Sequence, residues 1–74
     1  MIKNKKEKER VSRINWVREQ LEEEFRINKE IDFNSFLILK SFKMGVSQRT
    51  FKEYLGTAMY LSGFQKKKKN IVKK

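Results

Sequence analysis

The sequence predicts a small, mainly α-helical domain: a core of three helices followed by a short C-terminal β-hairpin. Three observations support this fold class. Apolar residues recur at spacings of three and four through most of the chain, as on one face of a helix. Gly45 and Gly63 stand where two of these patterns end, and glycine is the residue that most often follows a helix. Near the C-terminus, two short apolar pieces flank a polar turn, which is typical of a hairpin.

The composition limits the chemistry that the chain can perform. Its 74 residues make one small domain, which we place at residues 11–74 behind a basic N-terminal arm at residues 1–10. The chain has no Cys and no His, which excludes disulfides, Cys/His zinc sites and thiol or imidazole catalysis. It also has no glycine-rich phosphate loop. We therefore expect no metal, no cofactor, no small-molecule ligand and no enzymatic activity.

No apolar run approaches the ~20 residues that a membrane span needs. The charged N-terminus lacks the apolar stretch of a secretory signal. These features predict a cytoplasmic protein that does not bind membranes.

The charge is concentrated at the two ends of the chain. The net charge is +10, of which residues 1–10 contribute +3 and residues 66–74 contribute +6, whereas residues 11–46 are neutral and residues 47–65 carry +1. Solubilising tails are one explanation. The other, which we favour, is that the basic ends bind the phosphates of a nucleic acid.

The first helix is predicted over residues 11–27, where one apolar stripe contains Val11, Ile14, Val17, Leu21 and Phe25. Residues 1–10 then form either a frayed arm or a helical turn that continues into this helix. On the far side of the helix lie Trp16, Gln20 and Ile27. This side is a candidate homodimer interface, because Trp is favoured in interfaces. The alternative is that Trp16 packs under the hairpin or the arm of its own chain.

Asn28–Glu30 breaks the first helix, and residues 30–32 fit a short extended piece. Asp32 is a plausible N-cap for a second helix over residues 33–43. This helix is apolar on nearly every side, which predicts that it is sandwiched in the core or partly covered by a second subunit. A β-strand over Phe36–Leu39 is the competing prediction.

Gly45 is predicted to take a positive φ in a tight turn, and Ser47 to cap a third helix over residues 48–61. The residues predicted to face the core are Phe51, Tyr54, Leu55, Ala58 and either Leu61 or Ser62. The residues predicted to face outward are Arg49, Lys52, Glu53, Gly56 and Tyr60.

Phe64-Gln65 and Ile71-Val72 are predicted to form the hairpin strands. Lys66–Lys69 would then lie at the tip, and Asn70 would supply a positive φ. A disordered basic tail is the alternative.

The segment Gly45–Leu55 (GVSQRTFKEYL), followed eight residues later by Gly63-Phe64, resembles the helix-turn-helix of small archaeal and bacterial winged-helix regulators. Ser41 stands four residues before the turn glycine, where that family prefers Ala. The resemblance covers about residues 31–72 and implies a winged helix-turn-helix fold. Lys40 departs from it, since the family usually has an apolar residue there. Either the second helix is rotated, or the aliphatic stem of Lys40 packs while its ammonium reaches a polar surface.

The resemblance implies a sequence-specific double-stranded DNA-binding protein, in the role of a transcriptional regulator. We also expect a homodimer, because single domains of this size reach useful specificity mostly as dimers on paired half-sites. The third helix would enter the major groove, where Gln can pair with adenine and Arg with guanine. The base-reading candidates are Ser47, Gln48, Arg49 and Lys52. The candidates for contacts with the DNA backbone are Thr50, Tyr60, Lys66, Lys67, Lys68, Lys69, Lys5 and Lys6.

A winged-helix protein-interaction adaptor and a nonspecific architectural nucleic-acid-binding protein remain the alternatives. RNA binding is less favoured, because most aromatic residues lie on the predicted core stripes.

Overall fold

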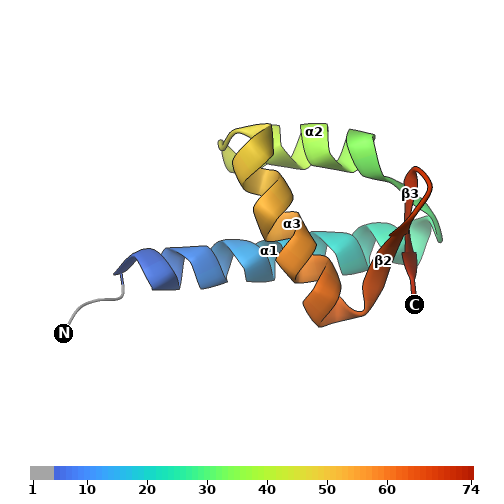
Figure 1. Cartoon of the computed structure of the whole chain (residues 1–74), viewed down its shortest axis with the longest axis horizontal. Coiled ribbons are helices and arrows are strands. Elements are labelled where there is room, and N and C mark those ends of the chain that lie inside the picture. The colour runs from blue at the N-terminus through green and yellow to red at the C-terminus, as the bar shows by residue number, and fades with distance from the viewer. Residues whose placement is uncertain (1–4) are drawn as a thin grey trace.

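The computed structural model describes residues 5–74, with side chains from Lys8 onward. Across these residues the chain is mainly helical with a small antiparallel sheet, a winged-helix-like arrangement that confirms the predicted fold class (Figure 1). The elements are α1 (Lys5–Ile27), β1 (Ile31–Asp32), α2 (Phe33–Met44), α3 (Gln48–Ser62), β2 (Phe64–Lys67) and β3 (Asn70–Lys73). Within this part of the chain, no helix combines the length and the apolar character needed to cross a membrane.

Helix α1 begins at Lys5, six residues before the predicted start. Residues 5–10 are therefore helical and continuous with the predicted helix, rather than a frayed arm. The N-terminal end of α1 extends past α2 and α3 (Figure 1). Val11, predicted to join the core, is 56% exposed. The periodicity placed Val11 on the correct face, but no other element reaches that far along the helix.

Both helix junctions around α2 use the predicted capping residues. Asp32 is extended, and its carboxylate accepts a hydrogen bond from the Ser35 backbone N–H at 2.9 Å. This hydrogen bond lowers the pKa of Asp32 from its ordinary value. Gly45 ends the helix at φ 82°, a conformation that costs glycine little. The helical assignment excludes the competing strand over Phe36–Leu39.

Helix α3 ends at Gly63, which takes φ 78°. The predicted inward residues Phe51, Tyr54, Leu55 and Ala58 are buried. Leu61, one of the two candidates for the last core position, is 52% exposed. Ser62, the other candidate, is half-buried and accepts a hydrogen bond from Arg18. The core also takes Met59, because the chain turns into β2 just after α3 and covers that side of the helix.

The C-terminal residues form the predicted hairpin, not a disordered tail. Strand β3 pairs with β2 on one side and with β1 on the other, so the extended piece before α2 completes a three-stranded sheet in the order β1-β3-β2. The residue with positive φ in the turn is Lys68, at 59°, and not Asn70 as predicted. Asn70 is instead the first residue of β3 and pairs with Lys67.

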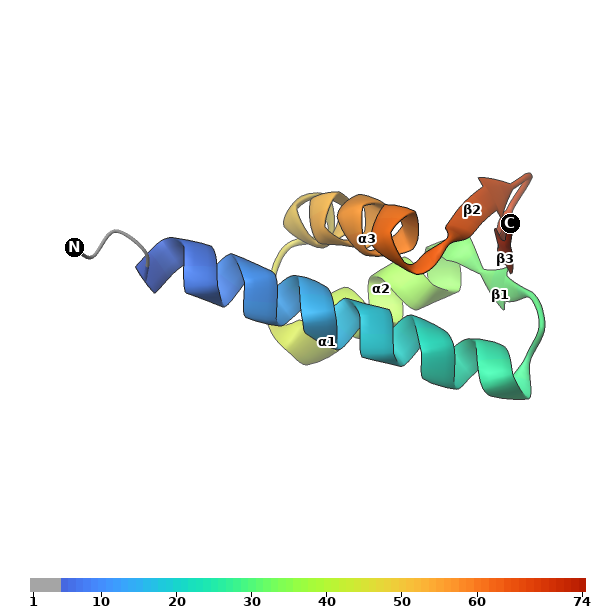
Figure 2. The same ribbon diagram turned by 90° about the horizontal axis from the view of Figure 1, so that it is seen from below.

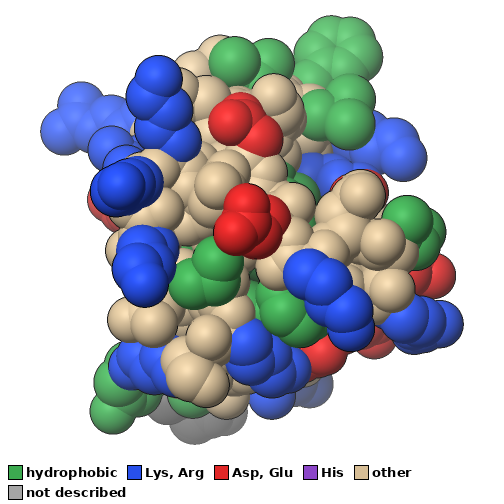
Figure 3. All heavy atoms as spheres, turned by 90° about the vertical axis from the view of Figure 1, so that its right-hand side faces the viewer, with side chains coloured by type: hydrophobic (Ala, Val, Ile, Leu, Met, Phe, Trp, Pro, Cys, Tyr) green, Lys and Arg blue, Asp and Glu red, His purple; other side chains and the backbone are tan. Residues whose placement is uncertain are grey.

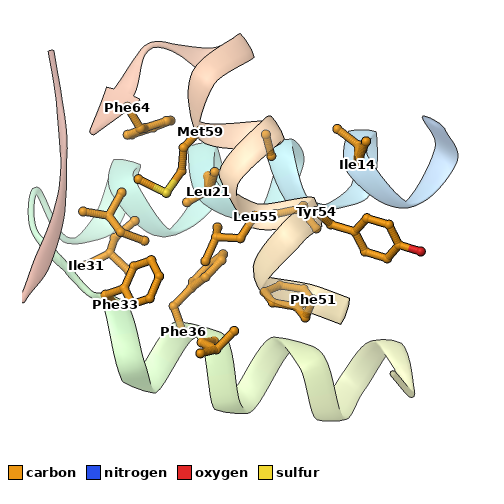
Figure 4. Packing of buried hydrophobic residues seen from close by; sticks show 14 residues of the cluster. Ile14, Leu21, Ile31, Phe33, Phe36, Phe51, Tyr54, Leu55, Met59 and Phe64 are labelled. Atoms are coloured by element: carbon orange, nitrogen blue, oxygen red, sulfur yellow. The ribbon is translucent and has the colours of Figure 1, made fainter. Parts of the chain in front are cut away.

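The core lies where the three helices and the sheet meet (Figure 4). Helix α3 crosses between the other helices, and Phe51 packs against Phe36 of α2 with ring centroids 6.2 Å apart. Phe64 and Ile71, both essentially buried, anchor the hairpin to the helical layer. The position of the hairpin relative to α3 is therefore fixed by core packing.

Lys40 is the charged residue that the core accommodates. Its side chain is only 7% exposed, and its Nζ donates a hydrogen bond to Gln20 Oε1 at 3.0 Å and lies 3.7 Å from Glu24 Oε2. The departure of Lys40 from the resemblance had two explanations, a rotated second helix or a packed aliphatic stem. The structure agrees with the packed stem. The stem is buried between α2 and α1, and the ammonium reaches polar groups on α1.

Candidate nucleic-acid interface

The start of α3 is built around the Ser47 cap. The Ser47 hydroxyl accepts a hydrogen bond from the Thr50 backbone N–H at 3.2 Å and donates one to Thr50 Oγ1 at 3.1 Å. Ser47 and Thr50, which were both predicted to touch DNA, are thus hydrogen-bonded to each other. Ser47 fixes the first turn of the helix, and this use of its hydroxyl leaves it a weaker candidate for reading a base than the residues that follow.

The next residues on α3 present their side chains to solvent. Gln48, Arg49 and Lys52 are all exposed on the first two turns. Among the described side chains, neither Arg49 nor Lys52 forms an ion pair. Glu53 is also exposed, one helical turn after Arg49, so the positive charge of this face is confined to the start of the helix. Three of the four predicted base-reading residues are therefore free and adjacent.

The outer face of α3 becomes uncharged toward its C-terminal end. Gly56 is exposed, and a Cβ built on it would meet no atom within 4 Å. Tyr60 is 76% exposed in the last turn, just before the chain enters the hairpin. A planar surface could approach this part of the helix closely, with the Tyr60 hydroxyl available at its edge.

The lysines of the hairpin differ in whether their ammonium groups contact other residues of the fold. Lys66 alternates to the same side of β2 as Phe64, and its Nζ lies 4.4 Å from the centre of the Phe33 ring. Lys67, Lys68 and Lys69 are exposed. Lys66 and Lys67 belong to strand β2, so only Lys68 and Lys69 form the tip that was predicted for all four lysines.

Lys73 is a basic residue of the hairpin that the prediction did not single out. Its Nζ lies 4.7 Å from the Phe64 ring centre and 3.5 Å from Glu22 Oε2 on α1. Cation–π contacts and ion pairs of this kind occupy Lys66 and Lys73 within the fold. Lys67–Lys69 are therefore the free lysines of the hairpin, since among the described side chains they form no ion pair and no contact with an aromatic ring.

Helix α3 and the hairpin lie on one side of α1 (Figure 2). The backbone of the tip is held in place, since the Phe33 N–H donates a hydrogen bond to the Lys69 carbonyl at 2.8 Å. The molecule seen from its hairpin end carries blue Lys and Arg side chains along the left edge, which is the front of the view in Figure 1, and also along the lower and right edges (Figure 3). The free lysines and the exposed start of α3 thus belong to elements that lie on the same side of α1.

Two hydrogen bonds that the sequence analysis did not foresee attach α3 to α1. Arg13 Nη1 donates to the Tyr54 hydroxyl at 3.3 Å, and Arg18 Nε donates to Ser62 Oγ at 3.0 Å. The first bond raises the pKa of Arg13 above its ordinary value. The partners are more than 40 residues apart in the chain, so no local pattern could have revealed them.

The candidate dimer residues on α1 do not share one free surface. Trp16 is half-buried against the core and lines a hollow with Lys43 and Met44 of α2. Gln20 accepts the hydrogen bond from Lys40. Ile27 is 76% exposed at the end of the helix. Trp16 is thus partly buried against the core of its own chain, in line with the alternative to a dimer contact, and it borders the end of α2.

The predicted phosphate contacts of Lys5 and Lys6 fall outside the described side chains, which begin at Lys8. In the part of the chain that the structure describes, no three acidic side chains gather in a way that would hold a metal ion.

We compared the chain with protein-family models, with curated proteins and with solved structures, and nothing matched in any of the three. Its function therefore has to be argued from the surface just described.

Proposed function

We propose that this chain is a sequence-specific double-stranded DNA-binding protein of the cytoplasm, acting as a transcriptional regulator. Helix α3 would enter the major groove, and the hairpin would lie on the phosphate backbone. The observation that supports this most strongly is the combination of free cationic side chains at the start of α3 with three free lysines on the hairpin, on the same side of α1 (Figure 2).

The two groups of side chains would have different roles. Gln48, Arg49 and Lys52 would contact base edges, where bidentate pairing of Gln with adenine or Arg with guanine discriminates between sequences. Lys67–Lys69 would contact phosphates, which provide affinity and orientation but no sequence information. Tyr60 would contact the backbone between these two regions, since it lies on the outer face of α3 next to the hairpin.

The salt dependence of binding to duplex DNA tests the phosphate contacts. If about six phosphates are neutralised, a plot of log K against log salt concentration has a slope of about −5, because each phosphate contributes roughly −0.9. Fluorescence anisotropy with a labelled duplex would measure it. Affinity that does not change with salt would contradict the proposal.

Two variants, compared per charge removed, separate the free lysines from the occupied ones. Replacing Lys67–Lys69 by Gln should reduce the magnitude of the salt slope by about 2.7, since three contacts are lost. Replacing Lys66 and Lys73 by Gln should reduce the magnitude of the salt slope by less per residue, because those ammonium groups already contact aromatic rings or Glu22. An equal effect per residue in both variants would show that the free lysines have no special role.

The base-reading role of α3 is tested by Arg49→Ala, with Arg26→Ala, an exposed arginine on α1, as the control. We expect Arg49→Ala to cost about 1–3 kcal/mol on the preferred sequence and much less on random duplex. The preferred sequence would come from a selection of bound duplexes from a random pool. A selection that returns no consensus would favour a nonspecific architectural protein.

The second candidate is a protein-interaction adaptor. It is favoured by one observation, the exposed apolar side chains of Ile38, Leu39 and Phe42 on α2. A stable complex with another protein, together with the absence of DNA affinity at low salt, would support the adaptor in place of the DNA-binding protein.

A further inference from the structure

The outer face of α2 is mainly apolar, and Lys43 at its C-terminal end is the exposed charged residue of the helix. Ile38 and Leu39 are 53% and 54% exposed, and Phe42 is 84% exposed. Asn34 and Ser35 complete this face and are exposed as well. The view in Figure 3 shows hydrophobic side chains gathered at the top of the molecule, over α2. Apolar side chains that cluster in this way commonly mark an interaction site.

We propose that this face binds a second copy of the chain, with the two α2 helices antiparallel about a twofold axis between Ile38 and Leu39. A twofold interface uses the same patch on both subunits, so the patch must be complementary to itself. With the axis at this point, Phe42 of each copy lies at the level of Ser35 of the other, and a large side chain faces a small one. This association does not depend on the proposed binding of DNA.

The charge distribution favours a second copy of the chain as the partner and an antiparallel orientation of the two α2 helices. The chain carries +10, so two copies repel one another wherever lysines face each other. The outer face of α2 avoids this, because Lys40 is turned toward α1 and Lys43 lies at the C-terminal end of the helix. Glu30 and Asp32 are exposed at the N-terminal end. Antiparallel packing therefore brings Lys43 of one copy toward Glu30 and Asp32 of the other, at both ends of the contact.

The shape of the face fits the same arrangement. A hollow of about 140 Å³ borders the N-terminal half of α2. Its apolar lining is Ile31, Phe36 and Leu39, and its polar lining includes Glu24, Glu30, Asp32, Ser35 and Lys40. The exposed ring of Phe42 from the second copy reaches this level of the helix. Aromatic side chains that fill a pocket on the partner are the usual anchors of an interface.

Sedimentation equilibrium of the full chain from micromolar to millimolar concentration tests the proposal. We expect a monomer–dimer equilibrium whose dissociation constant rises at least about 30-fold in Phe42→Glu, as for an anchor side chain. Tyr60→Glu, which changes an equally accessible aromatic on α3, should leave the constant unchanged. A wild-type chain that stays monomeric throughout would overturn the proposal, and so would a dimer that survives Phe42→Glu or dissociates equally in Tyr60→Glu.

Crosslinking gives a second, independent test of the axis. The chain contains no Cys, so one introduced thiol reports one position. Under mild oxidation Leu39→Cys should form a disulfide dimer, because residues next to the axis approach their counterparts closely. Leu61→Cys, similarly exposed on α3, should not. If Leu61→Cys crosslinks as readily as Leu39→Cys, the copies do not meet through α2.

A charge reversal checks the antiparallel direction. Lys43→Glu should weaken the dimer, because it then faces the acidic end of the other copy, and adding Glu30→Lys should restore it in part. A double variant weaker than Lys43→Glu alone would contradict the antiparallel arrangement.

Discussion

Replacing Lys40 separates the contribution of its buried stem from that of its ammonium group. Lys40→Ala removes three buried methylenes, each contributing about 0.8 kcal/mol, or roughly 2.4 kcal/mol in total. It also leaves the half-buried amide oxygen of Gln20 without its donor, which costs about 1 kcal/mol. The ion pair with Glu24 adds little, because that carboxylate is 37% exposed. We therefore expect Lys40→Ala to lower the free energy of unfolding by about 3 kcal/mol.

Lys40→Met keeps a stem of similar length and removes the charge. The hydrogen bond to Gln20 is lost, but the cost of partly desolvating the ammonium is removed too. We expect a loss of about 1 kcal/mol or less. Urea unfolding followed by circular dichroism at neutral pH measures both variants, with Lys52→Ala, an exposed lysine on α3, expected within about 0.5 kcal/mol of wild type.

The comparison of the stability lost in Lys40→Ala with that lost in Lys40→Met shows whether the buried stem or the ammonium group contributes more. If Lys40→Met were as destabilising as Lys40→Ala, the polar contacts with α1 would dominate, and the explanation from the buried stem would be wrong. If Lys40→Ala cost less than about 1 kcal/mol, the site would not be packed as described.

Three further substitutions test local features. Gly56→Ala should stabilise the protein by about 1 kcal/mol, because Gly56 lies inside a helix with open space at its Cβ position; a loss of stability would contradict this. Gly63→Ala should destabilise it by about 1 kcal/mol, because the residue needs a positive φ, and unfolding by urea would measure both effects. Asp32→Asn keeps a capping side chain but removes its charge. Since the hydrogen bond from Ser35 lowers the pKa of Asp32, the carboxylate stabilises the fold above its ordinary pKa of 3.8 and stops doing so as the pH falls through its lower folded value. The stability advantage of wild type over Asp32→Asn should therefore shrink in that acidic range, and an advantage independent of pH would refute the assignment.

Much of the fold could be predicted from the sequence, because it depends on interactions between residues close together in the chain. Asp32, Gly45, Ser47 and Gly63 act through backbone angles and hydrogen bonds within a few residues, so their types and spacing were sufficient to predict the ends of α2 and α3. The periodicity of Ile14–Leu21 predicted the buried face of α1 for the same reason. The exposed positions Arg49 and Lys52 followed from the opposite face of α3.

Contacts between segments that are distant in the chain could not be predicted from the sequence. The burial of Lys40 depends on Gln20, which lies 20 residues earlier in the chain, and the hydrogen bond between Arg13 and Tyr54 spans 41 residues. Lys66 looked equivalent to its neighbours in the lysine run until the pairing of β2 placed it over the Phe33 ring.

The sequence thus established the element types, the capped turn and the basic character of the hairpin, because each of these depends on neighbours along the chain. The three-dimensional packing established which lysines are free, which face of α2 is left uncovered and that Trp16 is partly buried against the core of its own chain. These depend on how the elements meet in space, where one surface is buried only if another reaches it.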